Sequence, residues 1–176
     1  MHRAATIARD GPMLSDVAPL IFPALLILAG IFDCFTLKIP NWLTALVALL
    51  FFPAALLTGM PGHDYLTHLA SAFIVLAAGF TLYAAGLFGG GDAKLMAAAA
   101  LWFGWPASMP FIVYTVLAGG VLAVVLLIWN LVKSDQEIRG HSWISRFGRF
   151  KPSVPYGVAI AAGAVLAYPQ TWSMVS

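Results

Sequence analysis

Residues 108–132 read SMPFIVYTVLAGGVLAVVLLIWNLV and contain no charged side chain. A helix of about 20 apolar residues crosses the hydrocarbon core of a bilayer, so this stretch is long enough to span a membrane. The rest of the chain is similar, because 61% of its 176 residues are hydrophobic and only 9% are charged. Soluble domains carry about 25% charged residues. The sequence therefore predicts an all-α integral membrane protein.

On both sides of this run, turns rich in Gly and Pro separate further apolar segments. We expect helices over residues 17–36, 41–59, 66–88, 93–105, 108–132 and 154–174. They predict a polytopic membrane helix bundle of about six transmembrane helices in one domain, residues 1–176. Residues 1–16 would be an N-terminal tail and residues 133–153 a cytoplasmic loop. The fourth helix is short, so it either thins the membrane or begins below the membrane surface.

The positions of the basic residues predict which loops face the cytoplasm, because short cytoplasmic loops hold an excess of Lys and Arg. If the N-terminus is outside, seven of the nine basic residues fall in the loops after the first, third and fifth helices. These seven are Lys38, Lys94, Lys133, Arg139, Arg146, Arg149 and Lys151. We therefore expect this end of the bundle to be cytoplasmic.

Two aspartates, Asp33 and Asp92, are among only five formal charges in residues 17–132. A carboxylate at membrane depth costs roughly 2.5 to 3.5 kcal/mol on insertion scales, so each one asks for an explanation. Taken alone, an aspartate just before a helix is an ordinary N-cap. The expected threading, however, brings both to one membrane face. Two neighbouring carboxylates can supply a base that activates water and an acid that protonates a leaving amine.

Residues near the aspartates are further candidates for the site. Three consecutive glycines, Gly89, Gly90 and Gly91, leave room for another backbone to approach. Lys94 either neutralises Asp92 or holds substrate, or it extends to lipid headgroups, as lysines near helix ends commonly do. Lys38 likewise either contacts the substrate or the active site, or extends to the headgroups. Tyr156 either lines the site or lies at the membrane interface. We interpret Pro40 and Asn41 as the turn into the second helix, with Asn41 as a local hydrogen bonder.

Other side chains exclude several classes of function. The single cysteine, Cys34, cannot form an internal disulfide or a paired-cysteine zinc site, and we interpret it as packing. His63 and His68 flank a loop expected on the opposite face, so we expect no metal site. The few basic residues argue against nucleic-acid binding. We expect no cofactor, and membrane lipid as the surroundings.

Two segments have a structural interpretation. The small side chains of residues 97–100, four alanines, favour close packing against a neighbouring helix. Residues 139–151 contain several basic side chains, and their apolar side chains at 143, 144, 147 and 150 fall on one helical face. This pattern is typical of an amphipathic segment lying on the inner leaflet. The alternative for this second segment is a gate that guides a substrate to the aspartates.

Several motifs together resemble those of the type IV prepilin peptidases. They are Asp33 followed by Ile39-Pro40-Asn41, a G-x-G-D match at Gly89-Gly90-Gly91-Asp92 with Lys94-Leu95 behind it, and Pro155-Tyr156-Gly157. The resemblance implies a multi-pass aspartic endopeptidase of the bacterial inner membrane, with Asp33 and Asp92 as its catalytic pair. Its substrate would be a type IV prepilin or pseudopilin, cut on the cytoplasmic side of the membrane.

The layout is similar to that of the compact enzymes of Tad/Flp pilus systems. Larger family members also carry a domain with paired cysteines and methylate the new N-terminus, so we do not expect N-methyltransferase activity here. Two other functions fit buried carboxylates. One is a small membrane transporter or proton channel that uses them as ion sites. The other is a related G-x-G-D protease that cleaves transmembrane substrates.

Overall fold

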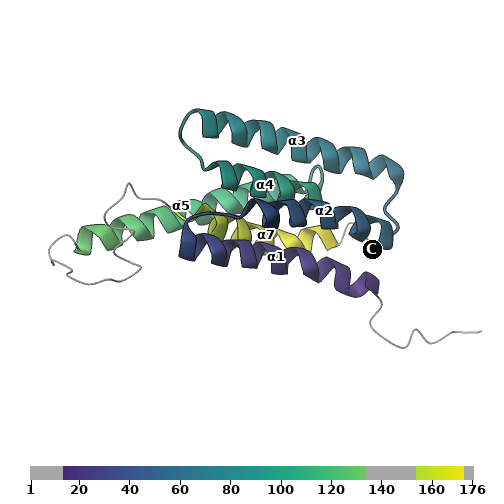
Figure 1. The fold of residues 1–176 in the computed structure, drawn as a ribbon, viewed down its shortest axis with the longest axis horizontal. Coiled ribbons are helices and arrows are strands. Elements are labelled where there is room, and N and C mark those ends of the chain that lie inside the picture. The colour runs from purple at the N-terminus through teal and green to yellow at the C-terminus, as the bar shows by residue number, and fades with distance from the viewer. Residues whose placement is uncertain (1–13, 134–153, 173–176) are drawn as a thin grey trace, which may run out of the picture.

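The computed structural model describes residues 14–133 and 154–172, and every regular element within these ranges is an α-helix. The helices are α1 (Leu14–Thr36), α2 (Asn41–Leu57), α3 (Gly62–Ala84), α4 (Gly90–Phe103), α5 (Ser108–Lys133) and α7 (Tyr156–Trp172). They run up and down the bundle alternately, as Figure 1 shows. The predicted all-α bundle is confirmed, and the described helix ends lie within four residues of the predicted ones.

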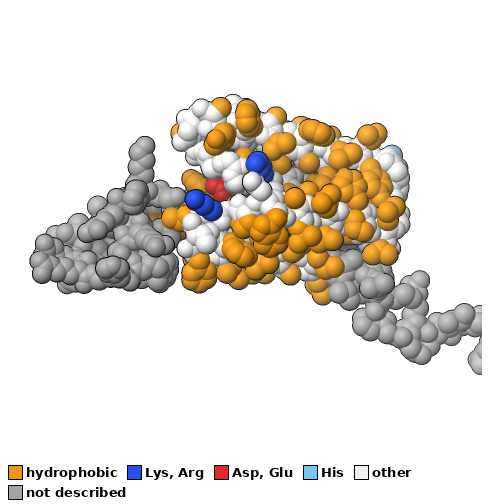
Figure 2. Space-filling model, in the orientation of Figure 1, with side chains coloured by type: hydrophobic (Ala, Val, Ile, Leu, Met, Phe, Trp, Pro, Cys, Tyr) orange, Lys and Arg blue, Asp and Glu red, His pale blue; other side chains and the backbone are white. Residues whose placement is uncertain are grey.

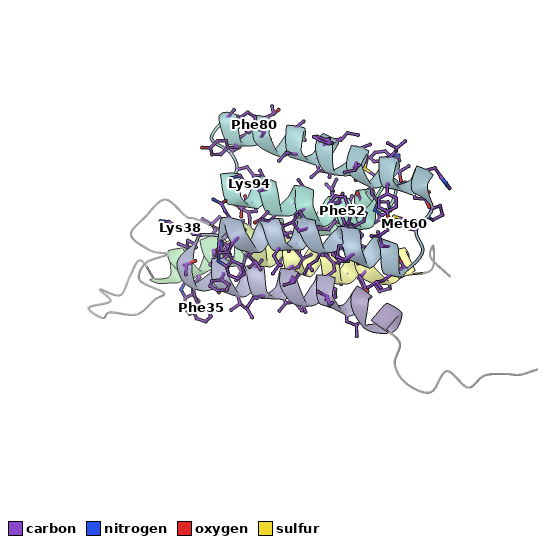
Figure 3. The ribbon with its side chains drawn as sticks, turned by 45° about the vertical axis from the view of Figure 1, so that its right-hand side comes forward. Phe35, Lys38, Phe52, Met60, Phe80 and Lys94 are labelled. Carbon is purple, nitrogen blue, oxygen red and sulfur yellow. The ribbon has the colours of Figure 1, made fainter. Side chains whose placement is uncertain are left out.

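The outer surface of these helices is apolar. Within the described residues, Gly62–Ala84 and Ser108–Trp129 are long and apolar enough to span a membrane. Leu20–Thr36, Asn41–Leu57 and Tyr156–Pro169 are shorter apolar helices. Large hydrophobic side chains cover the face seen in Figure 2. The exposed large hydrophobic residues of the bundle include Phe35, Phe52 and Phe80, which Figure 3 labels. Such a surface is stable against lipid tails, so the fold is a helical membrane bundle.

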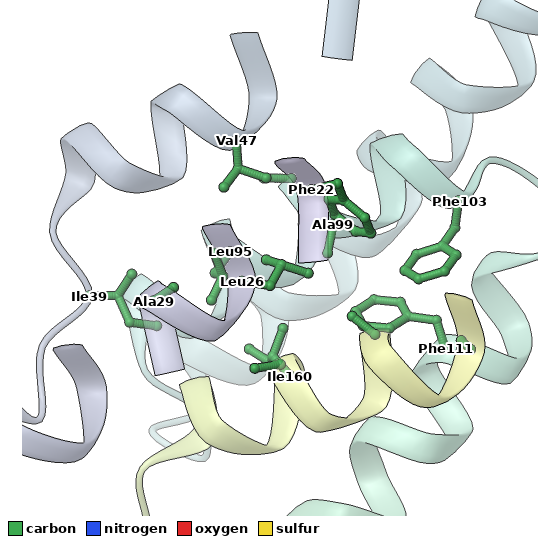
Figure 4. Packing of buried hydrophobic residues seen from close by; sticks show 14 of the residues in the cluster. Phe22, Leu26, Ala29, Ile39, Val47, Leu95, Ala99, Phe103, Phe111 and Ile160 are labelled. Atoms are coloured by element: carbon green, nitrogen blue, oxygen red, sulfur yellow. The ribbon is translucent and has the colours of Figure 1, made fainter. Parts of the chain in front are cut away.

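The centre of the bundle is a packed hydrophobic core contributed by five helices, shown in Figure 4. Its largest buried side chains include Phe22, Leu26, Leu43, Val47, Leu95, Phe111 and Ile160. Phe103 and Phe111 stack with ring centroids 4.8 Å apart, which joins the end of α4 to α5. The indole N–H of Trp102 donates to the carbonyl of Val47 at 2.8 Å and ties α4 to α2. This core holds the helix ends that carry the aspartates.

Helix α4 is surrounded by other helices, and its alanines are the reason it fits. Ala97 and Ala100 pack with Val75 of α3 in one buried cluster. At Gly79 of α3, a Cβ would lie 3.0 Å from the Cβ of Ala93, so the two helices touch closely. The prediction that the alanine run faces a neighbouring helix is confirmed.

The start of α4 differs from the prediction. We expected the helix to begin at 93, and the ordinary interpretation of Asp92 taken alone was an N-cap. Instead α4 begins at Gly90 with Gly89 as the N-cap, and Asp92 lies in the first turn. The reason is local, because the Asp92 carboxylate can reach back to the free N–H of the N-cap residue from this position.

Three predictions concern segments outside the described residues. These are the N-terminal tail, except for its last residues, the cytoplasmic loop beyond Lys133, and the amphipathic segment at 139–151.

Contact between α5 and α7 depends on a glycine, which gives a first test. At Gly163 of α7, a Cβ would lie 2.6 Å from the backbone nitrogen of Thr115 on α5, whereas at Gly120 of α5 it would meet nothing within 4 Å. We expect Gly163→Val to force the helices apart and destabilise the protein by about 1–3 kcal/mol. Thermal unfolding in detergent measures this. Gly120→Val is the matched control, and equal unfolding temperatures for the two variants would contradict the packing described.

Candidate active site

A cavity of about 510 Å³ lies at the end of the bundle where α1 and α3 end and α2, α4 and α7 begin. Both Asp33 and Asp92 line it. The other lining residues are Leu37, Lys38, Ile39, Asn41, Gly86, Leu87, Phe88, Gly89, Gly90, Gly91, Val154 and Tyr156. In Figure 2, acidic and basic side chains meet at this end of an otherwise apolar face. Two aspartates 59 positions apart in sequence thus share one cavity.

Asp33 is held at the end of α1 by the beginning of α7. Its side chain is buried, and the residue is only 4% exposed. The backbone N–H of Gly157 donates to Oδ2 of Asp33 at 2.7 Å. A Cβ at position 157 would lie 2.8 Å from the Cβ of Asp33, so only glycine lets the two backbones come this close. The free N–H groups in the first turn of a helix are natural partners for an anion.

Asp92 is held in a similar way by its own helix. The backbone N–H of Gly89, the N-cap residue of α4, is a hydrogen-bond partner of the Asp92 carboxylate. A Cβ at position 89 would collide with Oδ2 of Asp92. Each aspartate is therefore paired with a glycine that supplies an N–H and leaves space for the carboxylate.

The charge balance around the two carboxylates suits proton transfer. The described residues contain one ion pair, in which His63 Nε2 lies 2.9 Å from Asp64 Oδ1 at the opposite end of the bundle. No described cation is therefore paired with Asp33 or Asp92. Two carboxylates that interact closely titrate as a pair, and such a pair can offer a base and an acid at the same time.

The two candidate lysines are placed differently. Lys38 lines the cavity, in the turn between α1 and α2 where Leu37 adopts a left-handed backbone with φ of 53°. Lys94 does not line it, and its Nζ donates to Oδ1 of Asn41 at 3.3 Å. Figure 3 shows both lysines at the cavity end of the bundle. The predicted local hydrogen bond of Asn41 is therefore wrong, since its partner lies on a different helix that packs against α2.

The remaining candidates also have definite positions. Tyr156 lines the cavity and packs edge-on against Phe88, with ring centroids 5.2 Å apart. His68 makes a 2.7 Å contact between Nδ1 and the carbonyl of Leu101 and stacks on Phe51. Cys34 is half-buried. The described residues contain no group of three His, Cys, Asp or Glu that could hold a metal ion.

Sequence reasoning missed the part played by Gly157. Within the motif Pro155-Tyr156-Gly157, the sequence indicates a candidate site role for Tyr156 and none for Gly157, whereas in the structure Gly157 contacts Asp33. A glycine in the first turn of a helix was the available signal, because glycine there allows a side chain from another helix to reach the exposed N–H groups.

Comparisons with known proteins give a family. The model of the type IV leader peptidase family matches residues 20–124, which include both aspartates and the whole of α2, α3 and α4. No curated protein and no solved structure matches the chain. The family match indicates a peptidase that acts on a pilin-like substrate in general.

The close approach at Gly157 gives a second test. We expect Gly157→Ala to push α7 away from α1 and to weaken the buried hydrogen bond to Asp33, and hydrogen bonds to charged groups contribute about 1.5–3 kcal/mol. The variant should therefore unfold at a lower temperature in detergent than the wild type. Gly62→Ala is the control, because a Cβ there meets nothing within 4 Å. An unchanged unfolding temperature for Gly157→Ala would show that the contact contributes little.

Proposed function

The chain belongs to the type IV leader peptidase family, and on this premise we propose that it is a membrane aspartic endopeptidase with Asp33 and Asp92 as its catalytic pair. Its substrate is a type IV prepilin or a pilin-like protein, from which it removes the leader peptide. The observation that carries the proposal is that both aspartates line the same cavity, each held by a glycine N–H.

The proposed reaction is direct hydrolysis by a water molecule held between the two carboxylates. The ionised carboxylate takes a proton from the water as its oxygen attacks the scissile carbonyl carbon. The protonated carboxylate donates its proton to the leaving amine as the carbon–nitrogen bond breaks. The pair ends with the same number of protons, because one is gained and one is lost. No covalent intermediate and no cofactor are needed.

The glycines of the cavity support an extended substrate beside the acids. Gly90 and Gly91 form the first turn of α4 and both line the cavity. Without side chains they leave room for a substrate backbone to lie near Asp92. A peptide bond must be exposed in this way before a water can reach its carbonyl carbon.

The cavity end of the bundle faces the cytoplasm in this proposal, and the membrane is the bacterial inner membrane. The excess of Lys and Arg in the loops at this end supports the orientation. A leader that stays in the cytoplasm would then be cut at the inner membrane surface.

A transporter or proton channel is less well supported. Such a protein needs polar groups or water along its path across the membrane. Between the cavity and the opposite end, the described helices fill the bundle centre with large apolar side chains, among them Leu26, Phe111 and Ile160.

Removing either acid tests the mechanism. We expect Asp33→Asn and Asp92→Asn each to slow processing of a co-expressed prepilin by at least about a hundredfold, because general acid and base groups contribute about 10² to 10⁴ in rate. Immunoblotting of the precursor and mature forms measures this. Asp64→Asn is the matched control, since Asp64 lies at the other end of the bundle beside His63. Full processing by either cavity variant would rule out a two-aspartate mechanism.

The orientation has its own test. In a Cys34→Ala background, we expect Leu87→Cys to react with a membrane-impermeant maleimide in inverted vesicles but not in intact spheroplasts. Leu87 lines the cavity and is 69% exposed.

His63→Cys at the opposite end, where the side chain is 80% exposed, should show the reverse pattern. Labelling of Leu87→Cys from the outside would contradict a cytoplasmic site.

A further inference from the structure

A second hollow of about 480 Å³ lies beside the aspartate cavity, between α2 and α3. We call it the α2–α3 groove. Its lining residues are Asn41, Thr44, Ala45, Ala48, Phe52, Leu69, Ala72, Phe73, Leu76, Lys94, Ala97, Ala98 and Leu101. Apart from Asn41, Thr44 and Lys94 at one end, these side chains are all apolar. The groove is therefore an apolar trough with one polar end.

The groove exists because both walls pack on α4 more than on each other. Helix α3 packs extensively on α4, and α2 packs on α4 as well, while α2 and α3 meet mainly through Phe51, whose ring packs against Tyr65 and His68. Small side chains keep the space open, because Ala97 and Ala98 form its floor. Ala45 on α2 and Ala72 on α3 lie in its walls. Small residues at a helix surface allow another helix to approach closely in a membrane.

The groove and the aspartate cavity are neighbours, because Asn41 lines both. The hydrogen bond from Lys94 Nζ to Asn41 Oδ1 lies at this junction. Along α2 the groove extends from Asn41 to Phe52, and 11 residues of helix rise about 16 Å, or three turns. An apolar helix lying in the groove would therefore end beside the aspartates.

We propose that the α2–α3 groove binds the apolar helical segment of the substrate that adjoins the scissile bond, while the scissile bond itself lies in the aspartate cavity. This inference rests on the proposed function. In lipid, an apolar segment must be helical to satisfy its backbone hydrogen bonds. The backbone leaves the helix only at the polar junction of Asn41 and Lys94, where the cavity can accept exposed backbone groups. The groove thus selects substrates by an apolar helix and places their next peptide bond at the acids.

Filling the groove tests this inference. Ala45 is exposed and lines the groove, whereas Ala70 of α3 is exposed and does not line it. We expect Ala45→Trp to slow cleavage of a membrane-embedded prepilin by about tenfold or more, which is 1.4 kcal/mol of binding to the transition state. Ala70→Trp should cleave the same prepilin at the wild-type rate.

A shortened substrate distinguishes a loss of binding in the groove from a loss of catalysis at the aspartates. A soluble peptide with the leader and the scissile bond but no apolar helix should be cleaved equally by wild type, Ala45→Trp and Ala70→Trp. Wild-type cleavage of the full prepilin by Ala45→Trp would overturn the inference. If the wild type cleaves neither the full prepilin nor the soluble peptide, the proposed function is contradicted instead.

A crosslink decides the matter if Ala45→Trp loses activity on both substrates. In a Cys34→Ala, Asp92→Asn background, which keeps the substrate whole, we expect Phe73→Cys to form a disulfide with a cysteine in the apolar segment of the prepilin. Phe73 lines the groove. Ala70→Cys is the control and should not crosslink.

No disulfide at position 73, or equal disulfides at 70 and 73, would overturn the inference. Native mass spectrometry can also show whether a phospholipid is retained by the wild type and lost from Ala45→Trp. If that lipid is lost while Ala45→Trp still cleaves prepilin normally, the inference is overturned and the groove is a lipid site.

Discussion

A carboxylate buried in an apolar helix bundle must be hydrogen bonded, and Asp33 obtains its donor from the backbone N–H of Gly157 at 2.7 Å. An unpaired buried charge would cost several kcal/mol, so this contact constrains how α1 and α7 can pack. The helices can meet there because position 157 has no Cβ. Since Asp33 is 4% exposed, solvent water cannot readily replace this partner. The register of α7 against α1 thus determines where one acid of the proposed pair lies.

Small residues solve the same packing problem elsewhere in the bundle. Ala93 and Gly79 bring α3 onto α4, and Gly163 brings α7 onto α5. In lipid there is no hydrophobic driving force between helices, so close contact through small side chains contributes much of the association. The cost of this design is that α2 and α3 share α4 as their support, which leaves the α2–α3 groove between them. Stability and substrate access would therefore depend on one central helix.

The positions of the helices could be predicted from the sequence, because apolar runs between turns rich in Gly and Pro are long enough to be recognised singly. The placing of Asp33 and Asp92 at one end followed from counting helices between them. The contacts that hold the acids could not be predicted in the same way. Gly157 lies 124 positions from Asp33, and Lys94 lies 53 positions from its partner Asn41, so both pairings depend on helix packing. The N-cap at Gly89 depends only on neighbouring residues, yet the predicted start of this helix, residue 93, is three residues later than the observed start at Gly90.

In the proposed mechanism, Asp33 and Asp92 act together on one peptide bond. The most direct measurement is an experimental structure of the Asp92→Asn variant with an uncleaved prepilin in a lipid environment. We expect the scissile carbonyl carbon to lie between the two side chains, with both within reach of a single water, about 3 Å from each. A scissile bond bound outside the cavity of Asp33 and Asp92, or side chains too far apart for one water to bridge them, would contradict it.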